Sequence, residues 1–279
     1  MMKQWLSPAK LNLFLYITGR RPDNYHNLQT LFQFIDLCDS LTFNLRKDNK
    51  INLLTPFDNV PYDKNLIVIA AQCLKNYTQR LDLGIDITIN KKIPMGGGLG
   101  GASSNAATVL VALNELWKLA LPTETLITLG RKLGADVPIF IYGHAAFAEG
   151  IGDQLQSVDY QENWYLITYP NIEISTVEIF NDPGLKRDTP VRTIEQLLSQ
   201  PFEAFSNDCE NIVGKRYPKV HQIISYLSQF APTKLTGTGA CVFSLCHSQQ
   251  QAQEIQSTLN KFSVESFITR SLNTSPLYQ

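Results

Sequence analysis

Short apolar patterns predict the strands and the first helix of the N-terminal third of the chain. Alternation of apolar and polar residues, or a brief apolar run bounded by turn residues, is typical of strands and predicts them over residues 10–18, 41–45, 51–54 and 85–89. Between the last two segments, apolar residues at helical spacing begin at Leu66. They predict an amphipathic helix, with Asp63 as its N-cap.

Longer apolar stretches follow in the middle of the chain. Residues 105–117 are nearly apolar on every face, which predicts a buried helix that covers a sheet. A further helix is expected from residue 122 to about Gly134. The remaining pattern predicts strands over residues 139–142, 145–148, 164–168, 242–245 and 263–269, and helices over residues 193–199, 220–230 and 249–260.

The order of these elements predicts a mixed α+β protein with two subdomains. A polar segment, residues 159–163, precedes a fresh strand at Trp164. Because few contacts cross such segments, we place the boundary near residue 155. The N-terminal subdomain is expected to span residues 1–155 and the C-terminal subdomain residues 156–279.

Charge and cysteine content exclude several classes of protein. The chain has 24 Lys and Arg against 25 Asp and Glu, so its net charge of -1 provides no overall attraction to nucleic acid or to an anionic membrane. Its five cysteines include no C-x-x-C pair, which argues against a disulfide framework or a zinc site. The first ten residues lack the apolar stretch of a signal peptide, and no segment approaches the ~20 apolar residues that span a bilayer. We therefore expect a cytoplasmic protein.

A glycine-rich segment lies between a predicted strand and a predicted helix. Glycine costs roughly 0.5 to 1 kcal/mol relative to alanine in regular structure, so five glycines in this segment indicate positive φ angles or a ligand close to the backbone. A helix N-terminus directly downstream would add free N–H groups and a positive dipole end. A tight connection without a ligand is the ordinary alternative. The pattern predicts instead a phosphate-binding loop that holds ATP, made of Pro94, Met95, Gly96, Gly97, Gly98, Leu99, Gly100, Gly101, Ala102, Ser103 and Ser104.

Three familiar phosphate-binding sequences fit this loop poorly. Its glycines satisfy G-x-G-x-x-G, but the acidic residues about 20 positions on, Glu115 and Glu124, fall in predicted helices. Ala102 stands where a Walker loop requires lysine. The H-R-D and D-F-G motifs of protein kinases are absent from the sequence. The catalytic groups must therefore come from elsewhere in the chain.

Two further places carry candidate chemistry. Asp136 lies in an otherwise apolar stretch, where a charge is costly without a partner or a function, although a helix cap or a solvated turn is an alternative. A carboxylate there could accept the proton of an attacking hydroxyl group. Tyr25 and His26 lie in a predicted loop, which favours ligand recognition over core packing. The other histidines lack metal-ligand spacing, so no metal ligand is assigned.

Three motifs resemble a known superfamily. Pro94 with the following G-L-G-G-A-S-S, the N-terminal S-P-A-K-L-N-L and the later L-T-G-T-G-A are similar in order and spacing to the motifs of galactokinase, homoserine kinase, mevalonate kinase and phosphomevalonate kinase. Lys10 with Asn12, the Tyr25-His26 pair, G-A-D-V-P around Asp136 and S-N-D-C-E around Asp208 most resemble the 4-diphosphocytidyl-2-C-methyl-D-erythritol kinase family. The resemblance covers nearly the whole chain.

The resemblance implies a fold and an activity. It implies a two-subdomain GHMP-kinase-type fold with the active site in the cleft between the subdomains. It also implies transfer of phosphate from ATP, with Mg²⁺, to a hydroxyl of a cytidine-diphosphate-linked methylerythritol in the non-mevalonate route to isoprenoid precursors. A catalytically silent nucleotide-binding regulator, or a sister kinase for homoserine or mevalonate, remains open. The expected partners are ATP and this small molecule, without nucleic acid or membrane, and the oligomeric state is not predicted.

The resemblance also implies roles for individual residues. Lys10 would pair with Asp136, and the substrate would be met by Asn12, Tyr25, His26, Phe180, Gly237 and Gly239. Asn65 and Leu66 would contact the adenine side of ATP. Phe180 in plain core packing and the two glycines in an ordinary tight turn are alternatives. One departure is Asn24, which stands where the family usually has glycine, but asparagine tolerates positive φ. Another is Ala102, which keeps its backbone N–H.

Overall fold

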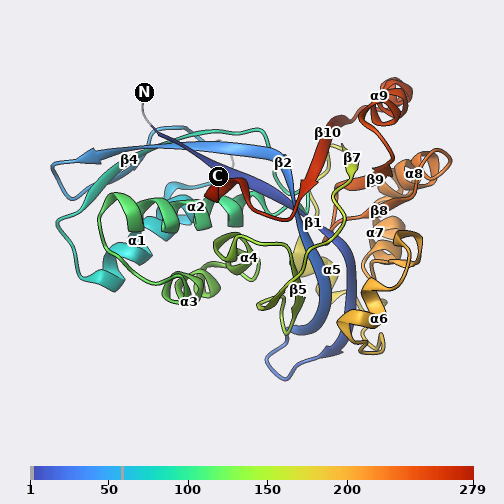
Figure 1. Cartoon of the computed structure of the whole chain (residues 1–279), viewed down its shortest axis with the longest axis horizontal. Coiled ribbons are helices and arrows are strands. Elements are labelled where there is room, and N and C mark those ends of the chain that lie inside the picture. Colours follow the sequence, from blue (N-terminus) through green and yellow to red (C-terminus); the bar gives the residue numbers. More distant parts are fainter. Residues whose placement is uncertain (1–2, 58–59) are drawn as a thin grey trace.

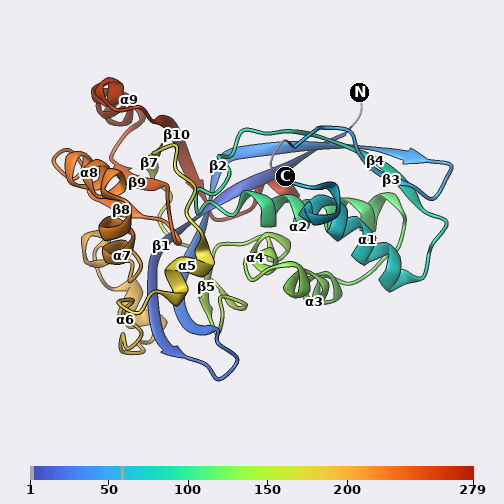
Figure 2. The same cartoon turned by 180° about the vertical axis from the view of Figure 1, so that it is seen from behind.

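Two long antiparallel strands run through the whole molecule. The computed structural model describes residues 3–57 and 60–279. Strand β1 (Gln4–Arg20) pairs with β2 (His26–Arg46) along almost its full length, and Figures 1 and 2 show both strands passing from one half of the molecule to the other. Strand β4 (Gly84–Asn90) pairs with the far end of β2, and β3 (Ile51–Leu53) pairs with β4 in parallel. Strands β3 and β4 therefore form one end of the sheet.

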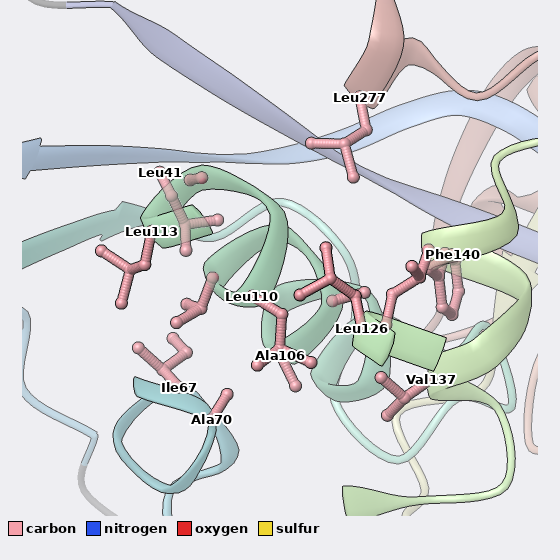
Figure 3. Packing of buried hydrophobic residues seen from close by; sticks show 14 of the residues in the cluster. Leu41, Ile67, Ala70, Ala106, Leu110, Leu113, Leu126, Val137, Phe140 and Leu277 are labelled. Carbon is pink, nitrogen blue, oxygen red and sulfur yellow. The ribbon is translucent and has the colours of Figure 1, made fainter. Parts of the chain in front are cut away.

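Four helices cover one face of this part of the sheet. They are α1 (Leu66–Thr78), α2 (Gly101–Leu116), α3 (Thr123–Leu133) and α4 (Val137–Tyr142). Helix α2 is central because its apolar residues face both the strands and the other helices. Figure 3 shows Leu110 and Leu113 of α2 between Ile67 of α1 and Leu41 of β2. Leu277, close to the C-terminus, packs into the same cluster.

The second half of the chain extends the sheet and adds a second group of helices. The strands are β5 (Ala146–Glu149), β6 (Gln154–Ser157), β7 (Trp164–Tyr169), β8 (Thr233–Leu235), β9 (Val242–Cys246) and β10 (Glu265–Leu272). The helices are α5 (Thr176–Asn181), α6 (Ile194–Leu198), α7 (Glu210–Arg216), α8 (Pro218–Leu227) and α9 (Gln249–Ser257). The sheet runs in the order β3-β4-β2-β10-β7-β9-β8. Strand β10 joins the two halves by pairing with β2 at Ile35 and Phe34.

The mixed α+β class is confirmed, together with most of the predicted elements. The predicted strand over residues 10–18 is part of β1, and the one over residues 41–45 is the end of the much longer β2. Asn24 has a φ of 67°, as its place in the turn before β2 suggested. The boundary near residue 155, which lies within β6, stays a prediction. Among the described residues, no helix is both long enough and apolar enough to cross a membrane.

Two local predictions are wrong. Residues 139–142 belong to helix α4 and not to a strand. The run is too short to show a helical period, and Pro138 in the first turn suits a helix start. The N-cap of α1 is Asn65, whose side chain accepts from the N–H of Ile67, while Asp63 lies in a short 3₁₀ turn just before it. Both residues are good caps, so residue type alone did not separate them.

Candidate active site

A cavity of about 510 Å³ opens between the two halves of the molecule. Its walls include the glycine-rich loop, residues near the start of α1, the middle of β1, the first part of β2, and residues of α5 and of the turn after β8. Three lysines line it, Lys10, Lys64 and Lys91. Asp136 is the one carboxylate among the described residues that line it. This excess of positive charge suits an anionic ligand.

The glycine-rich loop is held by the protein through its carbonyl groups, whereas most of its backbone N–H groups have no partners among the described residues. The carbonyl oxygens of Gly96, Gly97, Gly98 and Leu99 all accept hydrogen bonds, from Ala240 N, Cys241 N, Lys10 Nζ and Lys10 N. No backbone N–H from residue 95 to residue 103 donates to another residue in the described part of the chain. Residues 94–103 line the cavity, so these donors are available to phosphate oxygens there.

Positive φ angles and close packing explain the glycines. Gly96, Gly98 and Gly100 have φ between 64° and 74°, a region that side chains disfavour. A Cβ on Gly98 would lie 2.5 Å from the carbonyl oxygen of Thr236, and one on Gly97 would lie 2.7 Å from Sγ of Cys241. The glycine-rich loop is therefore pressed against the turn after β8, and its shape depends on that turn.

Helix α2 begins directly at the loop and adds its N-terminal dipole to the site. Gly100 is its N-cap without a side-chain cap, and the first bond of the helix runs from Ser104 N to Gly100 O. Ala102 and Ser103 line the cavity. Ser104 does not, because its hydroxyl is fully buried and lies 2.8 Å from Oγ of Ser7. Ser104 thus anchors the helix to β1.

Lys10 and Asp136 meet beside this loop. Nζ of Lys10 lies 3.3 Å from Oδ2 of Asp136, and the lysine side chain is only 3% exposed while the aspartate is 36% exposed. The same Nζ donates to Gly98 O at 3.1 Å and to Oδ1 of Asn12 at 2.6 Å. Asp136 occupies the N-cap position of α4, but its side chain makes no capping hydrogen bond. Its carboxylate instead faces a buried cation and the cavity.

A short chain of hydrogen bonds holds Asn12 in place. Nδ2 of Asn12 donates to Oγ1 of Thr30 at 2.8 Å, and Thr30 in turn donates to Phe14 O. The backbone N–H of Asn12 donates to Oγ1 of Thr236 at 3.0 Å. These bonds join β1, β2 and the turn after β8. They fix the amide that orients the Lys10 ammonium group.

Asp39, which does not line the cavity, holds the chain segment directly before the glycine-rich loop. Asp39 is fully buried and accepts hydrogen bonds from the backbone N–H groups of Lys92 and Ile93. It also pairs with the ammonium group of Lys91, which lines the cavity. Sequence reasoning assigned no role to Asp39, Lys91 or Lys64. The only signal was the lysine pair directly before the loop.

The structure brings His26 and Phe180 together and leaves Tyr25 apart from them. The rings of His26 and Phe180 stack with centroids 5.2 Å apart and an interplanar angle of 25°. Phe180 lines the cavity, His26 is 5% exposed and Tyr25 is 57% exposed. Burial lowers the pKa of His26, and the positive charges of Arg187 and Arg20 lower it further.

The remaining predicted residues divide between the cavity wall and its support. Asn65, Leu66 and Gly237 line the cavity, as does Thr238. Gly239 lies behind the wall, where a Cβ would meet Leu235 and Ile174. Among residues 3–57 and 60–279, no group of three or more His, Cys, Asp or Glu side chains could hold a metal ion.

Comparisons with known proteins agree with this arrangement. Residues 65–144 match the family model of the GHMP kinase N-terminal domain, and residues 192–265 match that of the GHMP kinase C-terminal domain. The structure resembles a solved 4-(cytidine 5'-diphospho)-2C-methyl-D-erythritol kinase with a TM-score of 0.84 and 26% identity, over 96% of this chain and 99% of that one.

Two further solved structures show the same fold. One is the mevalonate kinase of Methanococcus jannaschii, with a TM-score of 0.73 and 19% identity over 98% of this chain and 99% of that one. The other is a homoserine kinase from Cytophaga hutchinsonii, with a TM-score of 0.67 and 18% identity over 98% of this chain and 95% of that one. Both similarities extend over almost the whole chain.

Proposed function

This chain belongs to the GHMP kinase family of ATP-dependent small-molecule kinases, and we propose that its substrate is 4-diphosphocytidyl-2-C-methyl-D-erythritol. The reaction would transfer the γ-phosphoryl group of ATP to a hydroxyl group of that molecule, in the non-mevalonate route to isoprenoid precursors. The observation that carries the proposal is the Lys10–Asp136 pair, which lines the same cavity as the glycine-rich loop and Phe180.

Lys10 and Asp136 supply the chemistry that the transfer requires. The Asp136 carboxylate accepts the proton of the substrate hydroxyl as the new O–P bond forms and the bond to the β,γ-bridging oxygen of ATP breaks. Asn12 and Gly98 accept hydrogen bonds from the Lys10 ammonium group and hold it beside that carboxylate. The charge of this ammonium group opposes the negative charge that develops on the transferred group. Backbone N–H groups of residues 95–103 bind the phosphates that stay behind.

Magnesium fits this site as an ion that enters with ATP. Mg²⁺ is usually held by substrate phosphates and one or two carboxylates, not by a cage of protein ligands. Asp136 places a single partly exposed carboxylate near such an ion. The ion would neutralise charge on the phosphates and would be held mainly by them, because Asp136 is the acceptor of the substrate proton.

The aromatic residues near the cavity wall support the choice of a substrate that carries a nucleobase. Phe180 lines the cavity with its ring stacked on His26, and an aromatic ring at a cavity wall suits a flat nucleobase. Homoserine and mevalonate carry no ring that would pack against it. The likeness to the cytidylyl-methylerythritol kinase at 26% identity agrees with this choice.

Substrate profiling with one isosteric variant tests the proposal. ATP consumption is measured for purified protein with Mg²⁺ and the cytidylyl substrate, homoserine or mevalonate. Asp136→Asn keeps the shape and removes the charge, so its turnover should fall about 10² to 10⁴-fold, the scale of general-base catalysis. Asp82→Asn is the matched control, because Asp82 pairs with Arg80 on the surface and is 66% exposed.

Three outcomes separate the proposal from its alternatives. Turnover with the cytidylyl substrate alone, lost in Asp136→Asn and kept in Asp82→Asn, supports it. Turnover only with homoserine or mevalonate identifies a sister kinase and overturns the substrate assignment. Binding of ATP without turnover of any of the three compounds points to a silent nucleotide-binding regulator.

A further inference from the structure

His26 meets a charged partner that its sequence neighbourhood does not reveal. Nε of Arg187 donates a hydrogen bond to Nε2 of His26 at 2.9 Å, although 161 residues separate them in the chain. Arg187 lies in the segment after α5, and Figure 2 shows α5 beside the part of β1 and β2 that ends near His26. A guanidinium group has donors and no acceptor. Nε2 of His26 must therefore carry the lone pair.

This bond determines the protonation of the ring. A neutral imidazole has one N–H and one acceptor nitrogen, so with Nε2 as acceptor the proton lies on Nδ1. The two charged groups that act on His26 are both cations, Arg187 and Arg20 on β1, and α5 presents the uncharged ring of Phe180. Two neighbouring cations and burial disfavour a second proton. In water, neutral histidine prefers the proton on Nε2, so the bond to Arg187 reverses the usual preference.

Arg187 also holds the segment that carries Phe180. Nη2 of Arg187 donates to the carbonyl oxygens of Phe180 and Asp182, at 2.9 and 2.7 Å, and Nη1 donates to that of Leu185 at 3.0 Å. One side chain therefore holds the stacked ring and orients the histidine against it. The donors of Arg187 are directed inward to protein acceptors, so Arg187 acts through His26 and Phe180 as a positioning residue.

We propose that Arg187 determines the base specificity of this site by holding His26 as a hydrogen-bond donor at Nδ1 next to the face of Phe180. The proposal rests on the proposed function for the location of the base. The ligand group would be a ring acceptor of a pyrimidine. Cytosine offers adjacent acceptors at O2 and N3, whereas uracil carries a proton at N3 that would oppose the Nδ1 proton. A preset donor thus favours cytosine over uracil.

Two arginine variants separate this role from a general structural one. Arg187→Met keeps the apolar part of the side chain and removes all its donors. Arg216→Met is the matched control, because Arg216 also supports this segment through the side chain of Asp182 but makes no bond to His26 among the described residues. A role in folding alone would affect both variants in the same way.

The first measurement requires neither ligand nor turnover. Nitrogen NMR of ¹⁵N-histidine-labelled protein, with His26 assigned through His26→Gln, reports which ring nitrogen carries the proton. We expect the proton on Nδ1 in the native protein and in Arg216→Met, and a mixture or a reversal in Arg187→Met. A native His26 with its proton on Nε2, or an unchanged signal in Arg187→Met, overturns the proposal.

The second measurement is calorimetric titration with cytidine diphosphate and uridine diphosphate. The native protein should bind the cytidine compound at least about tenfold more tightly, because a site built for a hydrogen bond rejects the analogue that cannot make it. Arg187→Met should lose most of this ratio, and Arg216→Met should keep it. Equal affinities in the native protein overturn the proposal. Base discrimination without turnover of the cytidylyl substrate would instead refute the proposed function and leave the role of Arg187 supported.

Discussion

The contact between Gly97 and Cys241 offers a direct test of how the glycine-rich loop is held. Gly97 is not among the residues with positive φ, so alanine there introduces no backbone strain. The added Cβ would lie 2.7 Å from Sγ of Cys241, and the next atom, the carbonyl oxygen of Pro94, is 3.6 Å away. Ordinary contacts of this kind begin at 3.4 Å. About 0.7 Å of overlap must therefore be relieved at one sulfur atom.

The size of the effect follows from this geometry. Overpacking of a tight site typically costs about 1 to 3 kcal/mol, so Gly97→Ala should lower the free energy of unfolding by about 2 kcal/mol. Cys241→Ala removes one buried atom and should cost about 1 kcal/mol, on the scale of small deletions in a core. In the double variant the new Cβ occupies the space of the lost sulfur. Its cost should be about 1 kcal/mol and not the sum of about 3.

Urea unfolding and ATP binding measure this coupling. The four proteins of the double-mutant cycle are compared at constant m-value, and we expect a coupling energy of about 2 kcal/mol between the two positions. ATP affinity should fall in Gly97→Ala and recover in the double variant, because the loop returns to its position. Additive losses of stability, or ATP binding that is not restored, would refute the proposed packing.

A neighbouring glycine provides the matched control. A Cβ on Gly98 would meet backbone oxygens, those of Thr236 at 2.5 Å and Gly239 at 2.8 Å, and φ is 74°. The positive φ alone costs an alanine about 1 to 2 kcal/mol. Cys241→Ala should therefore not rescue Gly98→Ala. Rescue at Gly97 but not at Gly98 would identify the sulfur contact as the cause.

Three further predictions concern buried charges and thiols. Loss of one partner of a buried ion pair costs about 3 to 5 kcal/mol, and the cost should be smaller here because Lys91 keeps some contact with water. Asp39→Asn should therefore lower the free energy of unfolding in urea by about 2 to 3 kcal/mol. A loss below about 0.5 kcal/mol would contradict the structural role of Asp39. The pKa of His26 is lowered in the folded protein, so just below pH 6.5 the unfolded chain binds more protons than the folded one. The stability that neutral His26 contributes should therefore be lost as pH falls from 6.5 through the folded pKa. His26→Gln should flatten this part of the profile of stability against pH, and an unchanged profile would contradict the prediction. Burial raises the pKa of Cys38 to about 12 and that of Cys246 to about 11. At pH 8 these two thiols should react far more slowly with a thiol-specific disulfide reagent in the native protein than in urea, because the thiolate is the reactive form. Equal rates in the two states would exclude this protection.

Local patterns predicted the elements well where backbone geometry and residue type agree. The loop from Pro94 to Ser104 was found from its sequence because clustered glycines are needed where φ is positive or another chain segment approaches closely. Gly96, Gly98 and Gly100 do have positive φ. The failures are also local. Residues 139–142 are apolar on all sides and belong to α4, a helix of only six residues in which no period is visible. At the start of α1, two good capping residues competed.

The sequence by itself determined the family, the phosphate loop and the positions of its acidic and basic candidates. The tertiary structure alone decided which of these residues meet. Lys10 on β1 reaches Asp136 only because α4 packs against the sheet, and Arg187 reaches His26 only because the segment after α5 lies on the β1–β2 hairpin. Asp39 was not recognised because its partners are backbone groups 53 and 54 residues away. Such contacts depend on loop closure over long stretches of chain, which local propensity does not encode.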